Sequence, residues 1–191
     1  MSGKHIYRVR EYLGRTPVAS VRSISALVPN RNYAHVIMNH LLKRGEVRRI
    51  TRGYYTVHEE PSLLVYCLKP AYLGLQDAMS LHNLWEQETN PIIVTARKVR
   101  PGVREVLGQN VWVRRTSPKY LFGYDHMTSG NLTLPVSDVE KTLIDMIHFG
   151  EMRKDIARSF KERIDHEKLE KYLRKYSDGF QRKVWRTLGV K

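Results

Sequence analysis

The sequence lacks several features on which whole classes of protein depend. Cys67 is the only cysteine, so neither an internal disulfide nor a cysteine-based zinc site can form, which suits a reducing compartment. No apolar run approaches the roughly 18 residues that a membrane-spanning helix needs. A Gly-rich phosphate loop, a Gly-x-Ser-x-Gly turn and a His-Glu-x-x-His pair are also missing. We therefore expect a cytoplasmic protein with no membrane partner, no metal, no cofactor and no enzymatic activity.

Acidic residues are also few. The 191 residues include 33 Lys and Arg against 19 Asp and Glu, which gives a formal net charge of +14. Residues 1–58 hold eleven of the basic residues but only two acids, Glu11 and Glu46. A positive excess of this size favours a polyanionic partner, and nucleic acid is the commonest one.

The composition changes at residues 58–61, where two acids and a proline end the basic region. We place a domain boundary there. The predicted division is a DNA-binding domain over 1–60, an α+β domain over 61–150, and a helical C-terminal segment over 151–191 that packs on the second domain.

The first domain has the pattern of a winged helix. Apolar residues recur at helical intervals over 4–13, a short second helix fits 21–28, and a third helix is predicted from residue 30 or 31 to 44. Two strands follow, Glu46–Ile50 and Tyr54–Val57, joined by a three-residue loop with a glycine. In a winged helix, the helix before the hairpin enters the major groove and the wing lies along the DNA backbone.

The third predicted helix has one apolar and one polar face. Tyr33, Val36, Ile37 and Leu41 share the apolar arc, and His40 on the same arc is expected to be a core histidine. Asn can pair with adenine, Arg with guanine, and Lys can reach phosphate. The predicted nucleic-acid-binding residues are Arg31, Asn32, His35, Asn39 and Lys43 on the helix, with Arg48, Arg49, Arg52 and Tyr54 on the hairpin. Strand alternation predicts that Arg48 and Arg49 point to opposite faces.

The rest of the chain reads as mixed α and β. Helices are predicted over 62–68 and 75–84, and strands over 92–95, 111–114, 121–127 and 132–136. Residues 137–140 read as a capping box, with Ser137 as the cap, that opens a further helix. From residue 151 the chain favours three helical segments, broken near 165 and at 177–179. The predicted fold class is therefore α+β: an N-terminal winged helix-turn-helix, a mixed α/β domain and a helical C-terminal segment.

Three carboxylates raise the question of catalysis. Asp138 and Glu140 are better explained as first-turn acids of a capped helix. Asp145 is expected to bond a backbone amide or an arginine of the helical tail. Strand 92–95 is followed by a lysine but has no acid at the place that a restriction-like nuclease needs. The basic tail from Arg153 onward is either a solvated, internally paired surface or a second phosphate-binding patch.

Three stretches resemble the AbiEi antitoxins and their winged-helix relatives. These are residues 42–55, similar to that family's wing motif, residues 76–82, and residues 134–145, close to its Thr-Leu-Asp helix. Residues 169–172 and 188–189 also fit the helical end of that family. The resemblance implies a repressor of its own operon that also counters a nucleotidyltransferase-type toxin encoded beside it, without a stable complex between the two.

The sequence thus predicts a nucleoid-associated transcriptional regulator that binds double-stranded DNA at its own promoter or operator, most typically as an autorepressing antitoxin. Two alternatives stay open. One is a metal-dependent nuclease or other DNA-processing protein built on the second domain, and the other is a basic RNA-binding protein.

Overall fold

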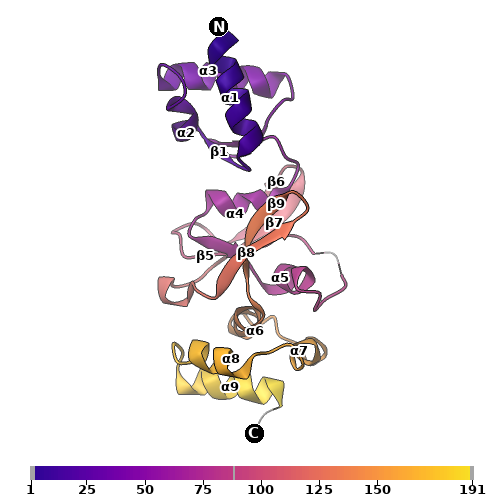
Figure 1. Cartoon of the computed structure of the whole chain (residues 1–191). Helices are drawn as coiled ribbons and strands as arrows, with labels where there is room; N and C mark the ends of the chain where they lie inside the picture. The colour runs from indigo at the N-terminus through magenta and orange to yellow at the C-terminus, as the bar shows by residue number, and fades with distance from the viewer. Residues whose placement is uncertain (1–2, 88, 190–191) are drawn as a thin grey trace.

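The computed structural model describes residues 3–87 and 89–189. The outer ends of the first and third predicted domains, residues 1–2 and 190–191, lie outside the described residues. Figure 1 shows residues 3–57, here called the N-terminal body, at one end of the molecule, a β-sheet in the middle and four helices at the other end. The structure confirms a mixed α+β protein with a helical C-terminus. The division into domains stays a prediction.

The N-terminal body consists of three helices and a three-stranded antiparallel sheet in the order β1-β3-β2. Its elements are α1 Gly3–Arg15, β1 Ala19–Ser20, α2 Val21–Ser25, α3 Arg31–Lys43, β2 Arg48–Thr51 and β3 Tyr54–Thr56. Local chemistry fixes the ends of α3. The Asn30 side chain caps its first turn by accepting from the Tyr33 amide at 2.9 Å. At its other end Gly45 takes φ +70°, and the amides of Gly45 and Glu46 close a Schellman motif on the carbonyls of Leu42 and Leu41.

The hairpin after α3 differs from the predicted one in its turn. Thr51 pairs with Tyr54, so the connection is the two-residue turn Arg52-Gly53 and not a three-residue loop. Gly53, the second residue of the turn, takes φ +82°, which glycine adopts without strain. A register shift between Arg49 and Thr51 takes up the extra residue, Ile50, and turns its side chain into the core.

The central sheet has six strands in the order β6-β7-β5-β4-β9-β8. Its strands are β4 Ala71–Leu73, β5 Ile92–Thr95, β6 Gly102–Val106, β7 Gln109–Arg115, β8 Tyr124–Ser129 and β9 Leu132–Ser137. The hairpins β6–β7 and β8–β9 are antiparallel and form the two edges, and β4 pairs antiparallel with β5. Strand β4 also pairs parallel with β9, and β5 pairs parallel with β7, so the sheet is mixed. Shorter elements of the same region are η1 Pro61–Leu63, α4 Leu64–Cys67, α5 Leu75–Leu81 and η2 Pro118–Tyr120.

The four C-terminal helices are α6 Val139–His148, α7 Lys154–Phe160, α8 His166–Leu173 and α9 Asp178–Leu188. The breaks before α8 and α9 fall at Asp165 and Ser177, as predicted. Helix α6 lies between the sheet and the other three helices (Figure 1), and every residue from Glu140 to Ile147 is buried. It is therefore the element that joins the sheet to the helical end.

The predicted cap of α6 is wrong by one residue. Asp138, and not Ser137, is the N-cap, because its carboxylate accepts from the Lys141 amide at 2.8 Å. Ser137 is still the last residue of β9, and its hydroxyl meets that of Thr142 at 2.7 Å. Glu140 does not reach back to the cap; it accepts from the Asp165 amide at 2.9 Å.

Apolar side chains form three clusters. One fills the N-terminal body between α1, α2, α3 and the hairpin. The second lies against the sheet beside α4, and the third fills the space between the sheet, α6 and the last three helices. In the described part of the chain, no helix is long and apolar enough to cross a membrane.

Candidate nucleic-acid interface

Helix α3 presents a polar face to solvent. Arg31, Asn32, His35, Asn39 and Lys43 are all exposed, as the sequence predicted. The opposite side of the helix packs in the core of the N-terminal body through Ala34, Ile37, Met38 and Leu41. Because buried apolar residues hold one side of α3 in place, its polar side is fixed in orientation and free to meet a partner.

Two residues of α3 depart from the predicted wheel. Val36 was predicted on the apolar arc, but its side chain is 50% exposed. It lies four residues after Asn32 and three before Asn39, so it belongs to the polar face. His40 was expected in the core and is only partly buried. The buried arc consists of Ala34, Ile37, Met38 and Leu41, which share one side of an ideal helix with 3.6 residues per turn, and Val36 falls on the opposite side.

The three hairpin arginines have different surroundings. Arg52 in the turn is exposed, and within the described residues it has no ion pair. Arg49 is also exposed, and its guanidinium lies 5.8 Å from the centre of the Tyr55 ring. Arg48 pairs with Glu59 just after the hairpin, so part of its charge is already neutralised within the protein. The structure therefore leaves Arg49 and Arg52 as the hairpin cations most available to a phosphate.

Tyr54 was predicted to contact nucleic acid, and that contact stays a prediction; the structure places the residue beside the central sheet. The side chain is half-buried and packs against the apolar cluster of the central sheet, together with Ile50 and Val18. Tyr54 thus attaches the N-terminal body to the rest of the molecule.

Glu46 ties the start of the hairpin to two helices. The Arg10 guanidinium of α1 donates to both of its carboxylate oxygens, at 2.7 and 2.8 Å, and Arg44 donates at 2.7 Å. The hydrogen bond from Arg10 lowers the pKa of Glu46 below its usual range. Two of the local cations are therefore used to hold α1, α3 and the hairpin together.

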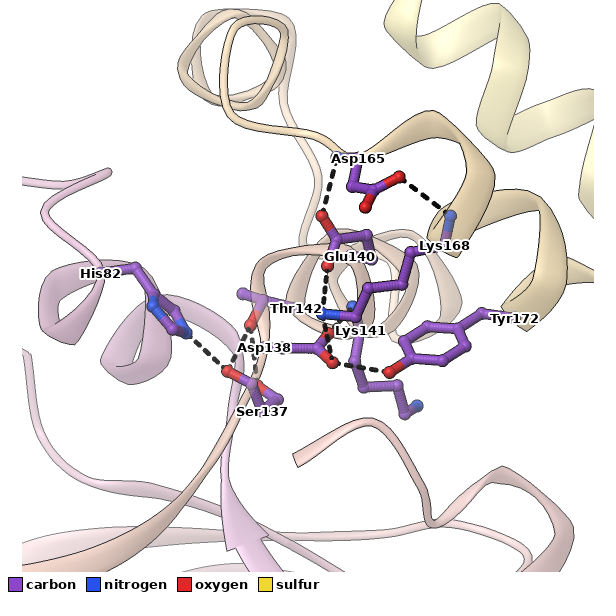
Figure 2. Close-up of polar contacts among 9 residues, drawn as sticks. All are labelled: His82, Ser137, Asp138, Glu140, Lys141, Thr142, Asp165, Lys168 and Tyr172. Atoms are coloured by element: carbon purple, nitrogen blue, oxygen red, sulfur yellow. Dashed lines mark hydrogen bonds and ion pairs between the residues drawn. The ribbon is translucent and has the colours of Figure 1, made fainter. Parts of the chain in front are cut away.

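A second concentration of polar side chains surrounds the first turn of α6 (Figure 2). Lys168 of α8 reaches Asp138 at 3.1 Å and Glu140 at 2.9 Å, and the Tyr172 hydroxyl donates to Asp138 at 2.7 Å. On the other side, a ring nitrogen of His82 lies 2.7 Å from the Ser137 carbonyl oxygen. The carboxylates that invite a catalytic interpretation are thus paired with α8, and their arrangement serves to lock α6, α5 and α8 together.

One turn further along α6 lies a fully buried ion pair. The Lys141 ammonium donates to Asp145, and the Tyr72 hydroxyl of β4 donates to the same carboxylate at 2.6 Å. The sequence predicted a backbone amide or an arginine of the helical tail as the partner of Asp145, and this prediction is wrong. Burial lowers the pKa of Lys141 and raises the pKa of Asp145, and their mutual attraction opposes both shifts. Within residues 3–87 and 89–189, no group of three or more His, Cys, Asp or Glu is placed to hold a metal ion.

No protein-family model matches the chain, and no curated protein sequence matches it. A solved structure does resemble it: the crystal structure of the RV2827C protein from Mycobacterium tuberculosis, with a TM-score of 0.59 and 14% sequence identity. The match covers 97% of this chain and 76% of that one. At this identity the likeness is one of fold, and it extends over nearly the whole length of the chain.

Proposed function

We propose that the chain is a sequence-specific, double-stranded-DNA-binding transcriptional regulator whose N-terminal body is a winged helix-turn-helix. The observation that carries the proposal is the exposed face of α3, which presents Arg31, Asn32, His35 and Asn39 and is followed in the chain by a basic hairpin. A rigid helix whose exposed side chains are amides, imidazole and guanidinium matches the donor and acceptor pattern of base edges in the major groove.

The contacts divide into two kinds on this proposal. Asn32 and Asn39 read base edges, since an amide can both donate to and accept from adenine. Arg49, Arg52 and Lys43 meet phosphates and set the register of the protein on the duplex. Phosphate contacts of this kind make binding fall steeply with salt, by about 0.9 released counterions per phosphate neutralised.

The resemblance of residues 42–55, 76–82 and 134–145 to AbiEi antitoxins supports a narrower proposal. The chain would repress its own operon and counter a nucleotidyltransferase-type toxin encoded beside it. Co-expression with the adjacent toxin tests the antitoxin proposal. If the proposal is correct, the full chain restores the growth of cells that express the toxin. An Asn39→Ala variant that loses operator binding and still restores growth would assign the two activities to different parts of the molecule.

The test of DNA reading compares the protein's own upstream region with a random duplex of equal length across about 50–300 mM salt, using fluorescence anisotropy. A preference for the upstream region that persists at the higher salt supports a specific regulator. Equal affinity for both duplexes, lost together as salt rises, contradicts it. A stronger affinity for structured RNA, or cleavage on adding Mg²⁺, would point to the RNA-binding or nuclease alternative.

Matched variants distinguish contacts to base edges from contacts to phosphates. Asn39→Ala is expected to cost about 1–3 kcal/mol on the specific duplex and little on the random one. Arg52→Ala should weaken both duplexes and reduce the salt slope by about one. Asn110→Ala, an exposed asparagine on β7, and Arg182→Ala, an exposed arginine on α9, are the corresponding controls and should change neither.

A further inference from the structure

A cavity at the helical end of the molecule is lined by cations. It has a volume of about 540 Å³ and lies between α7 and α9, against the end of α6. The residues that give it positive charge are Arg153, Lys154, Arg158, Lys161, Lys183 and Arg186. No acidic residue of the described chain lines it. The volume lies within the range of roughly 300–1,000 Å³ that small-ligand sites occupy.

The spacing of these residues puts two rows of charge opposite each other. Lys154, Arg158 and Lys161 follow one another at i, i+4 and i+7 and therefore share one face of α7. Lys183 and Arg186 share one face of α9 at i and i+3, and α7 packs against α9. Figure 1 places both helices at the end of the molecule remote from α3, so this charge is not an extension of the α3 face.

The charges are also left without internal partners. Of the six cations, only Arg153 forms an ion pair in the described part of the chain, with Asp155 at 2.8 Å. Like charges at i, i+4 repel each other, and an exposed helix more commonly alternates charge of opposite sign. Exposed cations that gather around one cavity, and that mostly lack acidic partners, create a positive potential that attracts an anionic ligand.

The cavity has an apolar part as well. Ile147 of α6 and Ala157 of α7 are buried and line it, and Met152 is partly buried beside them. Cations around an apolar floor suit a compact ligand that carries several phosphates at one end. An extended nucleic-acid backbone needs a continuous groove, whereas a cavity of this size, open to solvent on one side, accommodates a ligand of mononucleotide dimensions.

We propose that the cavity between α7 and α9 is a binding site for a compact polyphosphate, either inorganic or attached to a nucleoside. The guanidinium and ammonium groups of the two rows hold the phosphate chain by charge-assisted hydrogen bonds. The apolar floor contacts a base or ribose when one is present. No bond is formed or broken in this proposal.

Isothermal titration calorimetry on the full chain tests it with three probes: inorganic tripolyphosphate, adenosine triphosphate and adenosine. Tripolyphosphate is expected to bind at one site, and adenosine alone is not. Tighter binding of adenosine triphosphate than of tripolyphosphate identifies a nucleotide site, and equal binding identifies an inorganic polyphosphate site. Absence of binding by both phosphate probes overturns the proposal.

The double variant Arg158→Ala/Lys183→Ala removes one cation from each row. We expect it to weaken phosphate binding by about tenfold or more, because each lost contact is charge-assisted. The control Lys171→Ala/Arg182→Ala removes the same charge from exposed positions outside the cavity and should bind like the wild type. Equal weakening in both double variants would show a non-specific charge effect and would overturn the site.

Two further measurements test the proposal. The cavity variant should melt at the same temperature as the wild type or at a higher one, because it relieves repulsion between like charges. A lower melting temperature would show that the cations stabilise the fold, and it would overturn the proposal. A single-stranded oligonucleotide that binds more tightly than tripolyphosphate, and loses affinity in the cavity variant alone, would assign the cations to a nucleic-acid backbone and also overturn it.

Discussion

At the scale of single residues, Asp77 illustrates how burial controls the charge of a carboxyl group. Burial beside β5 raises the pKa of Asp77 to about 7; Glu60 adds to the rise, and the Ile92 amide, 3.4 Å away, opposes it. The unfolded chain releases this proton at about pH 4. Between these values the folded state binds more protons than the unfolded state, so this group makes the protein less stable as the pH rises.

Replacing Asp77 by Asn should remove this penalty, because the amide keeps the shape and the acceptor oxygen but never ionises. We expect the free energy of unfolding to rise by about 4 kcal/mol at pH 8 and to be unchanged near pH 3.5. Urea unfolding at the two pH values measures the difference. Asp125→Asn, at an exposed aspartate on β8, is the control. A gain of equal size at both pH values would contradict the titration.

Lys141 gives a second prediction at this scale. Removing one partner of a buried ion pair leaves the other charge unpaired, so Lys141→Met should destabilise the protein by about 3–5 kcal/mol. The triple variant Lys141→Met/Asp145→Leu/Tyr72→Phe removes both charges and the Tyr72 hydroxyl and leaves only the Tyr176 hydroxyl, which is 3.4 Å from the Lys141 ammonium in the wild type; we expect it to recover most of that loss. Chemical denaturation measures the stability of both variants. A triple variant as unstable as the single one would show that the loss of stability comes from altered packing and not from the unpaired buried charge.

The sequence could not reveal this pair. Lys141 lies between Glu140 and Thr142 near the start of a helix, a setting typical of a solvated residue. Its burial depends on Tyr72, Phe122 and Tyr176, which come from distant parts of the chain, so it is a tertiary effect. The polar face of α3 was predictable because it depends only on the 3.6-residue period, whereas the packing of Tyr54 and Ile50 against the central sheet depends on contacts between segments that are distant in the sequence.

At the scale of elements, the strands that were missed are those without a clear period. Strand β4 has three residues, all buried on both sides, and its apolar run is too short to distinguish from a helix. Strand β6 mixes Arg and Glu with valines, and its hairpin turn is Leu107-Gly108, with Leu107 at φ +53°. Leucine is a rare residue at positive φ, so the turn had no strong signal.

The start of β8 offers a test of close packing. Gly123 and Gly150 have similar positive φ angles, +67° and +75°, but a Cβ at Gly123 would lie 2.8 Å from the Tyr172 ring and one at Gly150 meets nothing within 4 Å. Gly150→Ala should cost only the backbone strain, about 1–2 kcal/mol. Gly123→Ala should cost about 1–3 kcal/mol more, because Tyr172 must move away from Asp138. Urea midpoints compare the two; equal losses would show that Tyr172 adapts freely.

At the scale of the whole molecule, the N-terminal body is attached to the sheet through the hairpin. Ile50 and Tyr54 pack against the cluster of the central sheet, and the Arg48–Glu59 pair lies at the same junction. The hairpin therefore has one side in the junction and its turn in solvent.

Tyr54→Ala is expected to loosen this junction without changing the core of the N-terminal body. Differential scanning calorimetry should then resolve two transitions, or a broader one, in place of a single cooperative transition. Tyr7→Ala, at a side chain that is 70% exposed on α1, is the matched control and should leave the transition unchanged. A single sharp transition in the Tyr54 variant would show that the junction does not couple the two parts.

The strand order of the central sheet also has a consequence for how the protein is made. Every core residue of the N-terminal body lies within the first 57 residues, so this core can close early on the ribosome. Strand β4, in contrast, lies between β5 and β9, and β9 is translated long after β4. While β9 is still being synthesised, the N-terminal body can already be folded, whereas one edge of β4 has no strand paired with it. During that interval the molecule has its polar α3 face but not the cavity between α7 and α9, which only the last helix completes.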